Sequence, residues 1–261
     1  NINYLAKGVL NLLPNFSFDS KKIDLEKTIN AETKQAIATL KEVGYRNEKE
    51  IEIKYSDDKL LNNYLNNLDW TKPWSAGAQF SSICVFTKTQ NLNLDKYLED
   101  FISKKVNSET GSYYSSLPSS SREVINGAMK VLSGLDWLNV PIHHPKKLID
   151  YCLNNQPTLE GCDVVDFVYV LYRCSSETNY RRKEINELFK KVFDNLKKLY
   201  VLEDKAFSYF VNKSQTHYYG LQITNGLNRA DIHGTTLCLW AIIMMLKSLE
   251  ISEKKFNIIK P

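Results

Sequence analysis

The sequence predicts an all-α protein whose helices form an α/α toroid, a ring in which inner and outer helices alternate. Apolar residues recur at helical spacing along most of the chain. Glycine (10) and proline (7) are few among 261 residues, which disfavours an all-β fold and a disordered chain. The helical segments are also of two kinds that alternate along the sequence, and this alternation predicts the toroid.

Segments of the first kind are amphipathic, and we expect them on the outside of the ring because a helix with one apolar stripe buries only that stripe. They are 30–45, 94–106, 144–155 and 180–200. In the first, Ala36, Ile37, Leu40 and Val43 share a predicted buried stripe, and Gly44 ends the helix.

Segments of the second kind carry apolar or small residues almost all round, which is typical of helices packed on every side. They are 74–86, 122–138, 161–174 and 233–249. Small residues near three of their starts, such as Gly127 and Gly234, allow the helix starts to crowd together or leave space for a ligand. The non-helical segments 110–116 and 205–220 precede two of these helices, and we expect both at one rim.

The composition indicates one domain in a reducing compartment. A chain of 261 residues that is 43% hydrophobic supports one sizeable core, so we treat 1–261 as a single toroid domain, with 1–70 assigned less clearly. The net charge of +4 is spread along the chain and does not favour a nucleic-acid partner. Five cysteines without close pairs predict a cytoplasmic protein, and the longest apolar run, 237–246, is too short to span a membrane.

The aromatic stretches "GSYY" (111–114) and "AFSYF" (206–210) each precede an inner helix with small residues near its start. This arrangement resembles the repeats of the terpenoid cyclase and protein prenyltransferase superfamily, over roughly residues 70–250. The resemblance implies a central cavity and a transferase-like or cyclase-like enzyme with an isoprenoid substrate. Fewer helix pairs are visible than a closed ring of that superfamily has, so residues 1–70 supply the rest or the ring is open.

The same resemblance implies a zinc site. In the β subunits of protein prenyltransferases, zinc is held by an Asp-x-Cys pair at one inner-helix start and by a His at a later one. Here "EGC" (160–162) stands in place of the pair, and "ADIHG" (230–234) resembles the His segment. Glu160, Cys162 and His233 would then be the ligands, with Asp231 or Asp163 as substitutes, and a fourth position stays open for substrate. The family's diphosphate-binding cations have no counterpart in "YCLNNQPTL" (151–159), where this sequence departs from the pattern.

Two interpretations of His233 need no metal. His233 and Asp231 could act as base and acid, with Tyr218 nearby, because the pKa of histidine lies near neutrality. Alternatively Asp231 caps the helix N-terminus, Gly234 relieves crowding, and His233 donates to a neighbouring carbonyl.

Asp163 and Asp166 stand three residues apart on a buried helix and therefore share a face. Carboxylates in an apolar helix are costly unless they are paired. The two either face a cavity as catalytic groups, or cap the helix and form a salt bridge with Arg173 or Arg181.

Aromatic residues next to the helix starts are candidates for holding a substrate. They are Trp70, Trp74, Tyr114, Tyr209 and Tyr219. Such rings stack on sugars, line an isoprenoid site or stabilise a carbocation. The alternative is that they fill the loop end of the barrel.

Three classes of function follow from these observations. The first is a prenyltransferase-like or cyclase-like enzyme, with or without a metal. The second is a carbohydrate-active toroid, a polysaccharide lyase or glycosidase relative, which would use a Tyr/His pair or two carboxylates drawn from Tyr218, His217, Asp163 and Asp166. The third is a non-catalytic binding or scaffold domain.

Overall fold

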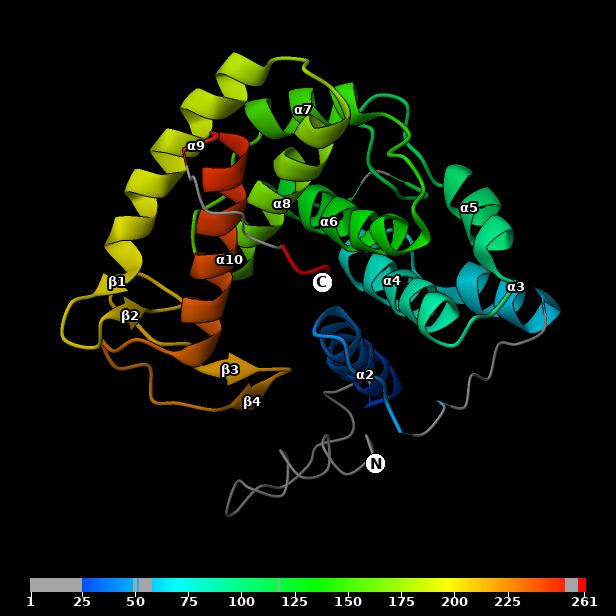
Figure 1. Cartoon of the computed structure of the whole chain (residues 1–261), viewed down its shortest axis with the longest axis horizontal. Helices are drawn as coiled ribbons and strands as arrows, with labels where there is room; N and C mark the ends of the chain where they lie inside the picture. The colour runs from blue at the N-terminus through cyan, green and yellow to red at the C-terminus, as the bar shows by residue number, and fades with distance from the viewer. Residues whose placement is uncertain (1–24, 49–50, 52–57, 117, 252–257) are drawn as a thin grey trace.

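The computed structural model describes residues 25–48, 51, 58–116, 118–251 and 258–261, and this part of the chain is mainly helical (Figure 1). The elements are α2 (Leu25–Glu42), α3 (Asp58–Asn67), α4 (Pro73–Thr89), α5 (Asp95–Ser103), α6 (Ser121–Leu138), α7 (Pro145–Asn154), α8 (Gly161–Glu177), α9 (Arg182–Leu196), the 3₁₀ helix Lys197–Leu199, β1 (Tyr200–Val201), β2 (Ala206–Phe207), β3 (His217–Tyr218), β4 (Leu221–Gln222) and α10 (Ile232–Ser248). The predicted all-α class is confirmed. No described helix is both long and apolar enough to cross a membrane.

Helices α4, α6, α8 and α10 pack against one another in chain order. They correspond to the four segments expected to be inner helices. Helices α5, α7 and α9 lie outside this row, with α5 on α4, α7 on α8, and α9 on α8 and α10 (Figure 1). The segment 205–220, expected to be non-helical, contains β2 and β3 of two short antiparallel hairpins, β1–β2 and β3–β4.

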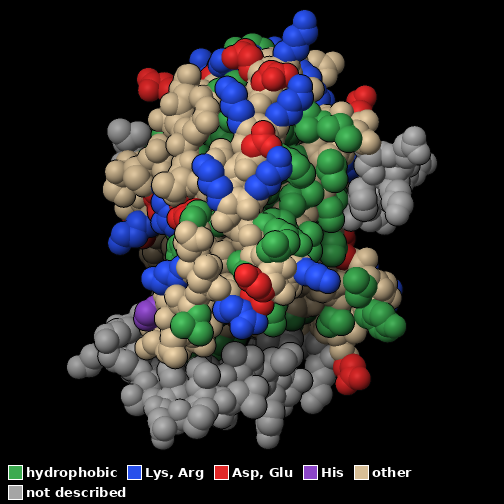
Figure 2. All heavy atoms as spheres, turned by 90° about the vertical axis from the view of Figure 1, so that its left-hand side faces the viewer, with side chains coloured by type: hydrophobic (Ala, Val, Ile, Leu, Met, Phe, Trp, Pro, Cys, Tyr) green, Lys and Arg blue, Asp and Glu red, His purple; other side chains and the backbone are tan. Residues whose placement is uncertain are grey.

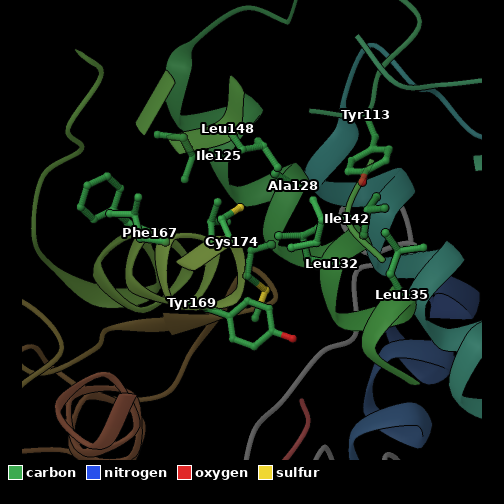
Figure 3. Packing of buried hydrophobic residues seen from close by; sticks show 14 of the residues in the cluster. Tyr113, Ile125, Ala128, Leu132, Leu135, Ile142, Leu148, Phe167, Tyr169 and Cys174 are labelled. Carbon is green, nitrogen blue, oxygen red and sulfur yellow. The ribbon is translucent and has the colours of Figure 1, made fainter. Parts of the chain in front are cut away.

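One buried layer of the core lies between α6 and α8. Ile125 and Leu132 of α6, with Phe167 and Val168 of α8, are fully buried. Figure 3 shows side chains from α6, α7 and α8 meeting in this layer. Burying such side chains stabilises the fold by about 1.5–3 kcal/mol each, so this layer holds α6 and α8 together.

Two small residues allow backbones to approach closely. A Cβ atom added at Gly127 of α6 would lie 2.6 Å from Cβ of Pro73 at the start of α4. A Cβ atom added at Gly234 of α10 would lie 2.4 Å from the backbone nitrogen of Tyr209. Small side chains at these starts therefore serve helix and loop packing, the first of the two roles expected from the sequence.

Two of the expected helix faces differ in the structure. Leu40 (37% exposed) and Val43 (54% exposed) were expected in the buried stripe of α2 but lie outside it. Ile37 of the expected stripe is buried, and Lys34 is buried beside it on the face of α2 that packs against α4.

Helix α10 was expected to be packed on every side, yet it exposes Ile232 and Leu239. Figure 2 shows the side of the molecule that carries α9, where hydrophobic side chains lie beside charged ones. One face of this very apolar helix therefore has no covering among the described residues.

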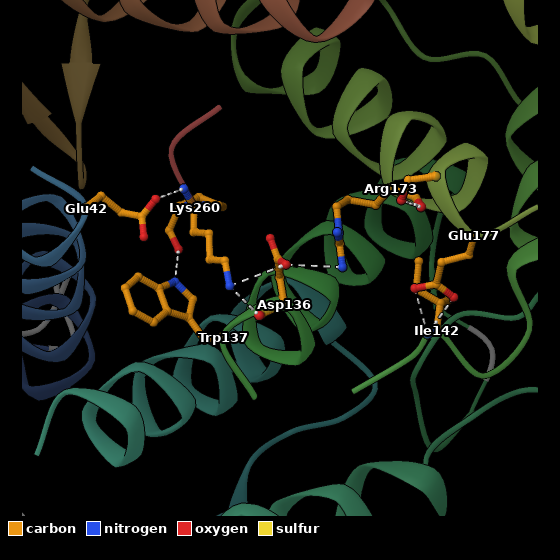
Figure 4. A network of polar contacts seen from close by, with 9 residues as sticks. Glu42, Asp136, Trp137, Ile142, Arg173, Glu177 and Lys260 are labelled. Carbon is orange, nitrogen blue, oxygen red and sulfur yellow. Dashed lines mark hydrogen bonds and ion pairs between the residues drawn. The ribbon is translucent and has the colours of Figure 1, made fainter. Parts of the chain in front are cut away.

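A polar network ties the last described residues to the C-terminal end of α6 (Figure 4). The indole nitrogen of Trp137 donates to the carbonyl oxygen of Pro261 at 3.1 Å, and Lys260 donates through its Nζ to the carbonyl oxygen of Asp136 at 2.9 Å. Arg173 of α8 forms an ion pair with Asp136 at 3.3 Å. These polar contacts therefore join α6, α8 and the last described residues at this end of the row.

Candidate functional site

The first turns of the inner helices are linked to one another at the other end of the row. The Arg122 guanidinium of α6 lies 4.6 Å from the ring centroid of Trp74 of α4. The Nε atom of Arg122 also donates to both carboxylate oxygens of Asp163 of α8, at 2.9 and 2.7 Å. Since each contact joins one helix start to the next, α4, α6 and α8 run in the same direction and their starts meet.

Tyr209 continues the chain of contacts from α8 to α10. Its hydroxyl donates to Sγ of Cys162, at 3.2 Å, and its ring centroid lies 5.2 Å from that of His233. Gly161 has a φ of +55°, and a Cβ atom there would lie 2.3 Å from the Tyr209 ring. Glycine at position 161 therefore lets the tyrosine ring sit between the two helix starts.

Asp231 fixes the loop that carries Tyr209. One carboxylate oxygen accepts from the backbone N–H of Gly234, at 2.7 Å, so Asp231 is the N-cap of α10. The other accepts from the backbone N–H groups of Tyr209, at 2.8 Å, and Gln215, at 3.0 Å. With three donors on its carboxylate, Asp231 holds the site in place, as the capping interpretation expects, and is a poor candidate for proton transfer.

His233 is held as a neutral imidazole. Its Nδ1 lies 2.8 Å from Oε1 of Gln215, and because an amide oxygen only accepts, Nδ1 carries the proton. The Nε2 atom then keeps its lone pair. Burial lowers the pKa of His233 below its usual 6.5, against the opposing charges of Asp231 and Glu32. The expected hydrogen-bond acceptor, a neighbouring carbonyl, is therefore the side chain of Gln215.

Aromatic rings flank this histidine. The ring centroid of Tyr218 lies 5.8 Å from that of His233, and the two rings are nearly perpendicular. The ring of Tyr209 is only tilted relative to that of His233. His233, Gln215, Tyr209 and Tyr218 are referred to below as the His233 cluster. Three of its members are half-buried, and Gln215 is buried.

Helix α2 reaches the edge of the His233 cluster through Glu32. The hydroxyls of Tyr218 and Tyr219 both donate to Oε1 of Glu32, at 2.6 and 2.9 Å. Burial, together with the nearby carboxylate, raises the pKa of both phenols, so they stay protonated. The β3–β4 hairpin is thereby bonded to α2, while Tyr218 also contacts His233 at the start of α10.

The residues expected to bind zinc do not assemble into a metal site. Within the described part of the chain, no three His, Cys, Asp or Glu side chains are grouped so that they could hold a metal ion. Oε1 of Glu160 accepts from the backbone N–H of Val211, at 2.9 Å, and Cys162 is engaged by Tyr209. Burial raises the pKa of the Cys162 thiol, whereas a metal ligand needs a thiolate. The donor set does not fit zinc.

The two aspartates of α8 have different surroundings. Asp163 accepts from Arg122 and, at 2.9 Å, from Nδ2 of Asn126. The expected partners Arg173 and Arg181 instead pair with other carboxylates. Sequence reasoning missed Arg122 as the partner of Asp163 because the two residues lie on different helices, far apart in the chain, and no helical spacing connects them.

Asp166 is 1% exposed, and its Oδ2 has no hydrogen-bond partner among the described residues. Burial raises its pKa to about 6, with Lys130 opposing the shift and Asp163 adding to it. Lys34 of α2 is a second buried ionisable group: burial and the charge of Lys130 lower its pKa to about 7. Neither lysine was singled out from the sequence, because lysines at helical spacing ordinarily face solvent.

The aromatic candidates divide into three groups. Tyr209 and Tyr219 lie at the His233 cluster, and Trp74 lies half-buried on Arg122. Trp70 is buried against Phe101 and donates to the carbonyl oxygen of Leu65, so it packs between α3 and α5. Tyr114 is likewise buried, and its hydroxyl is paired with that of Thr110.

Comparison of the chain with models of protein families, with curated proteins and with solved structures finds no match.

Proposed function

We propose that the inner and outer helices form an incomplete α/α toroid, and that the protein is an enzyme whose site lies where the inner-helix starts meet. The contacts from Trp74 through Arg122 and Asp163 to the Cys162–Tyr209–His233 group support this proposal. They bring four helix starts to one end, the arrangement that the superfamily resemblance implies. In such an array a ligand binds over the helix starts.

His233 is the proposed general base. The observation that carries this role is the hydrogen bond to Gln215, which fixes the proton on Nδ1 and leaves Nε2 free to accept one. The lowered pKa keeps the imidazole neutral, and so basic, at neutral pH. Tyr209 and Tyr218 keep their phenolic protons beside it. Their hydroxyls are bonded to Cys162 and Glu32 in this structure, and in the proposed reaction a bound substrate takes one of these hydroxyls as its proton donor.

A saccharide is the substrate class that best fits a pair made of His233 and a neighbouring tyrosine. The second function class needs either two free carboxylates or a Tyr/His pair, and Asp163 is occupied by Arg122. The Tyr/His version corresponds to a lyase reaction on a uronic acid: His233 removes the proton next to the carboxylate, and a tyrosine protonates the departing glycosidic oxygen. An isoprenoid substrate, which the resemblance implies, is the second candidate and shares the aromatic walls.

The test is turnover by the full chain on two substrates, a polyuronate and a prenyl diphosphate. We expect unsaturated sugar ends from the polyuronate and no product from the diphosphate. The His233→Gln variant should lower the rate by roughly 10²–10⁴-fold, the usual contribution of a general base. The control is His217→Gln, because His217 is exposed and its Nδ1 lies near the Thr216 hydroxyl instead.

Two results would contradict the proposal. One is an unchanged rate in His233→Gln, which removes the base from the mechanism. The other is a prenylated or cyclised product with no sugar cleavage, which keeps the toroid enzyme but replaces the substrate.

A further inference from the structure

The guanidinium group of Arg122 is held along one edge and left open at the other. Its Nε atom donates to both carboxylate oxygens of Asp163, at 2.9 and 2.7 Å, and its Cζ atom lies 4.6 Å from the centroid of the Trp74 ring. The terminal nitrogens Nη1 and Nη2 have no hydrogen-bond or ion-pair partner among the described residues. A guanidinium has five N–H donors, so four remain for another molecule.

This arrangement differs from that of two other arginines that pair with a carboxylate. Arg181 reaches Asp150 through Nη1, at 2.7 Å. Arg229 reaches Asp204 through Nη2 as well as Nε. In both, the fold itself uses a terminal nitrogen. At Arg122 the fold uses Nε alone, and the side chain is 50% exposed, so its terminal edge is available to a ligand.

The surroundings of this edge favour an anionic group. Arg122 lies in the first turn of α6, where the backbone N–H groups carry partial positive charge. The neighbouring carboxylates are already bonded, Asp163 to Arg122 and Glu123 to the backbone N–H of Trp74 at 3.0 Å. The terminal edge of a guanidinium matches a carboxylate, because two oxygens accept two parallel N–H bonds.

Arg122 is near His233 but not in contact with it. Asp163, the partner of Arg122, directly follows Cys162 in the chain. Tyr209 bonds to Cys162 and packs its ring against that of His233. A carboxylate bound at Arg122 therefore belongs to a different sugar unit from the one beside the histidine.

We propose that Arg122 binds the carboxylate of a second uronate unit, next to the unit that His233 deprotonates, and so selects an acidic saccharide over a neutral one. The inference rests on the proposed lyase function and adds a binding subsite to it. Asp163 and Trp74 hold the guanidinium in the orientation that presents Nη1 and Nη2.

The test is calorimetric titration of the full chain carrying His233→Gln, so that the ligand is not consumed. The ligands are an oligogalacturonate and the same oligomer with its carboxylates methyl-esterified. We expect the acidic oligomer to bind about tenfold more tightly, because its hydrogen bonds to the guanidinium join two charged groups. Adding Arg122→Gln should abolish this preference.

Arg46→Gln is the control for the loss of one positive charge. Arg46 is exposed and lines a pocket with Gln90, beyond the C-terminal end of α4 and so away from Trp74. It should keep the preference for the acidic oligomer. If Arg122→Gln does not fold, Arg122→Lys takes its place, since it keeps the charge but loses the two-nitrogen edge, and it should weaken acidic binding severalfold.

Equal binding of the two oligomers, binding of neither, or a preference that survives the change at Arg122 would overturn the subsite. Turnover separates this result from the proposed reaction. If the preference depends on Arg122 but the wild type releases no unsaturated sugar, the subsite stands and the lyase reaction falls. If the wild type cleaves polyuronate and Arg122→Gln keeps the full preference, the reaction stands and the subsite falls.

Discussion

The α4–α6 junction and the α8–α10 junction lie at the same end of the helix row but are closed differently. At the first, backbone meets backbone, with Gly127 against Pro73. At the second, the loop that carries Tyr209 is inserted between the helix starts and leaves His233 half-buried. The first junction is a packing joint. The second holds a polar group, His233, whose Nε2 atom has no hydrogen-bond partner among the described residues. This difference separates a helix start that serves packing from a candidate site.

The largest effect is expected at the packing joint. Gly127→Val places branched carbon atoms where Pro73 already lies, so the helices must separate. We expect a loss of about 3 kcal/mol of unfolding free energy, measured by urea denaturation. Gly44→Ala is the control, because nothing lies within 4 Å of an added Cβ and the cost is limited to a left-handed backbone. Equal losses in the two variants would show that α4 and α6 are not in backbone contact.

The next effect compares the N-caps of two inner helices. Asp231→Ala removes the cap of α10 and the acceptor of two loop N–H groups, for a loss of about 2–3 kcal/mol. Ser120→Ala removes only the cap of α6, worth about 1 kcal/mol. Both are measured by thermal unfolding. If Asp231→Ala costs no more than Ser120→Ala, Asp231 does not hold the loop.

The smallest effect is a gain of stability at Asp166. Its folded pKa, about 6, lies above its ordinary 3.8, so the ionised form is disfavoured in the fold. That cost is present above about pH 6 and disappears as the pH falls from 6 toward 4. Asp166→Asn should therefore stabilise the protein by about 1–2 kcal/mol near pH 8 and not near pH 4. Destabilisation at pH 8 would mean that the Asp166 carboxylate has a stabilising partner.

The sequence predicted the helices well because their signals are local. Apolar periodicity marks α9, where Ile185 and Val192 are buried, and Gly44 ends α2 with a φ of +85°. The capping role of Asp231 was among the alternatives because a cap and its helix are adjacent in sequence. In α2 the same periodicity placed Leu40 on the wrong face, since spacing alone does not show which side a neighbouring helix covers.

The site was predicted in outline only, because its contacts join distant segments. Tyr209 reaches Cys162 across 47 positions, and Gln215 reaches His233 across 18, with no motif to mark either pair. The zinc ligands were carried over from a resemblance at inner-helix starts, but in the structure Cys162 is bonded to Tyr209 and Glu160 to the backbone of Val211. Lys34 looked like a surface lysine because its burial depends on α4, which follows it in the chain.

The central claim is that His233 is a neutral base whose proton is held on Nδ1 by Gln215. Nitrogen-edited NMR of the imidazole across a pH titration measures both features in the intact protein. We predict the Nδ1–H tautomer and a pKa below the usual 6.5, with both changing in Gln215→Leu but not in His217→Gln. An Nε2–H tautomer, or a pKa above 6.5, would contradict the account.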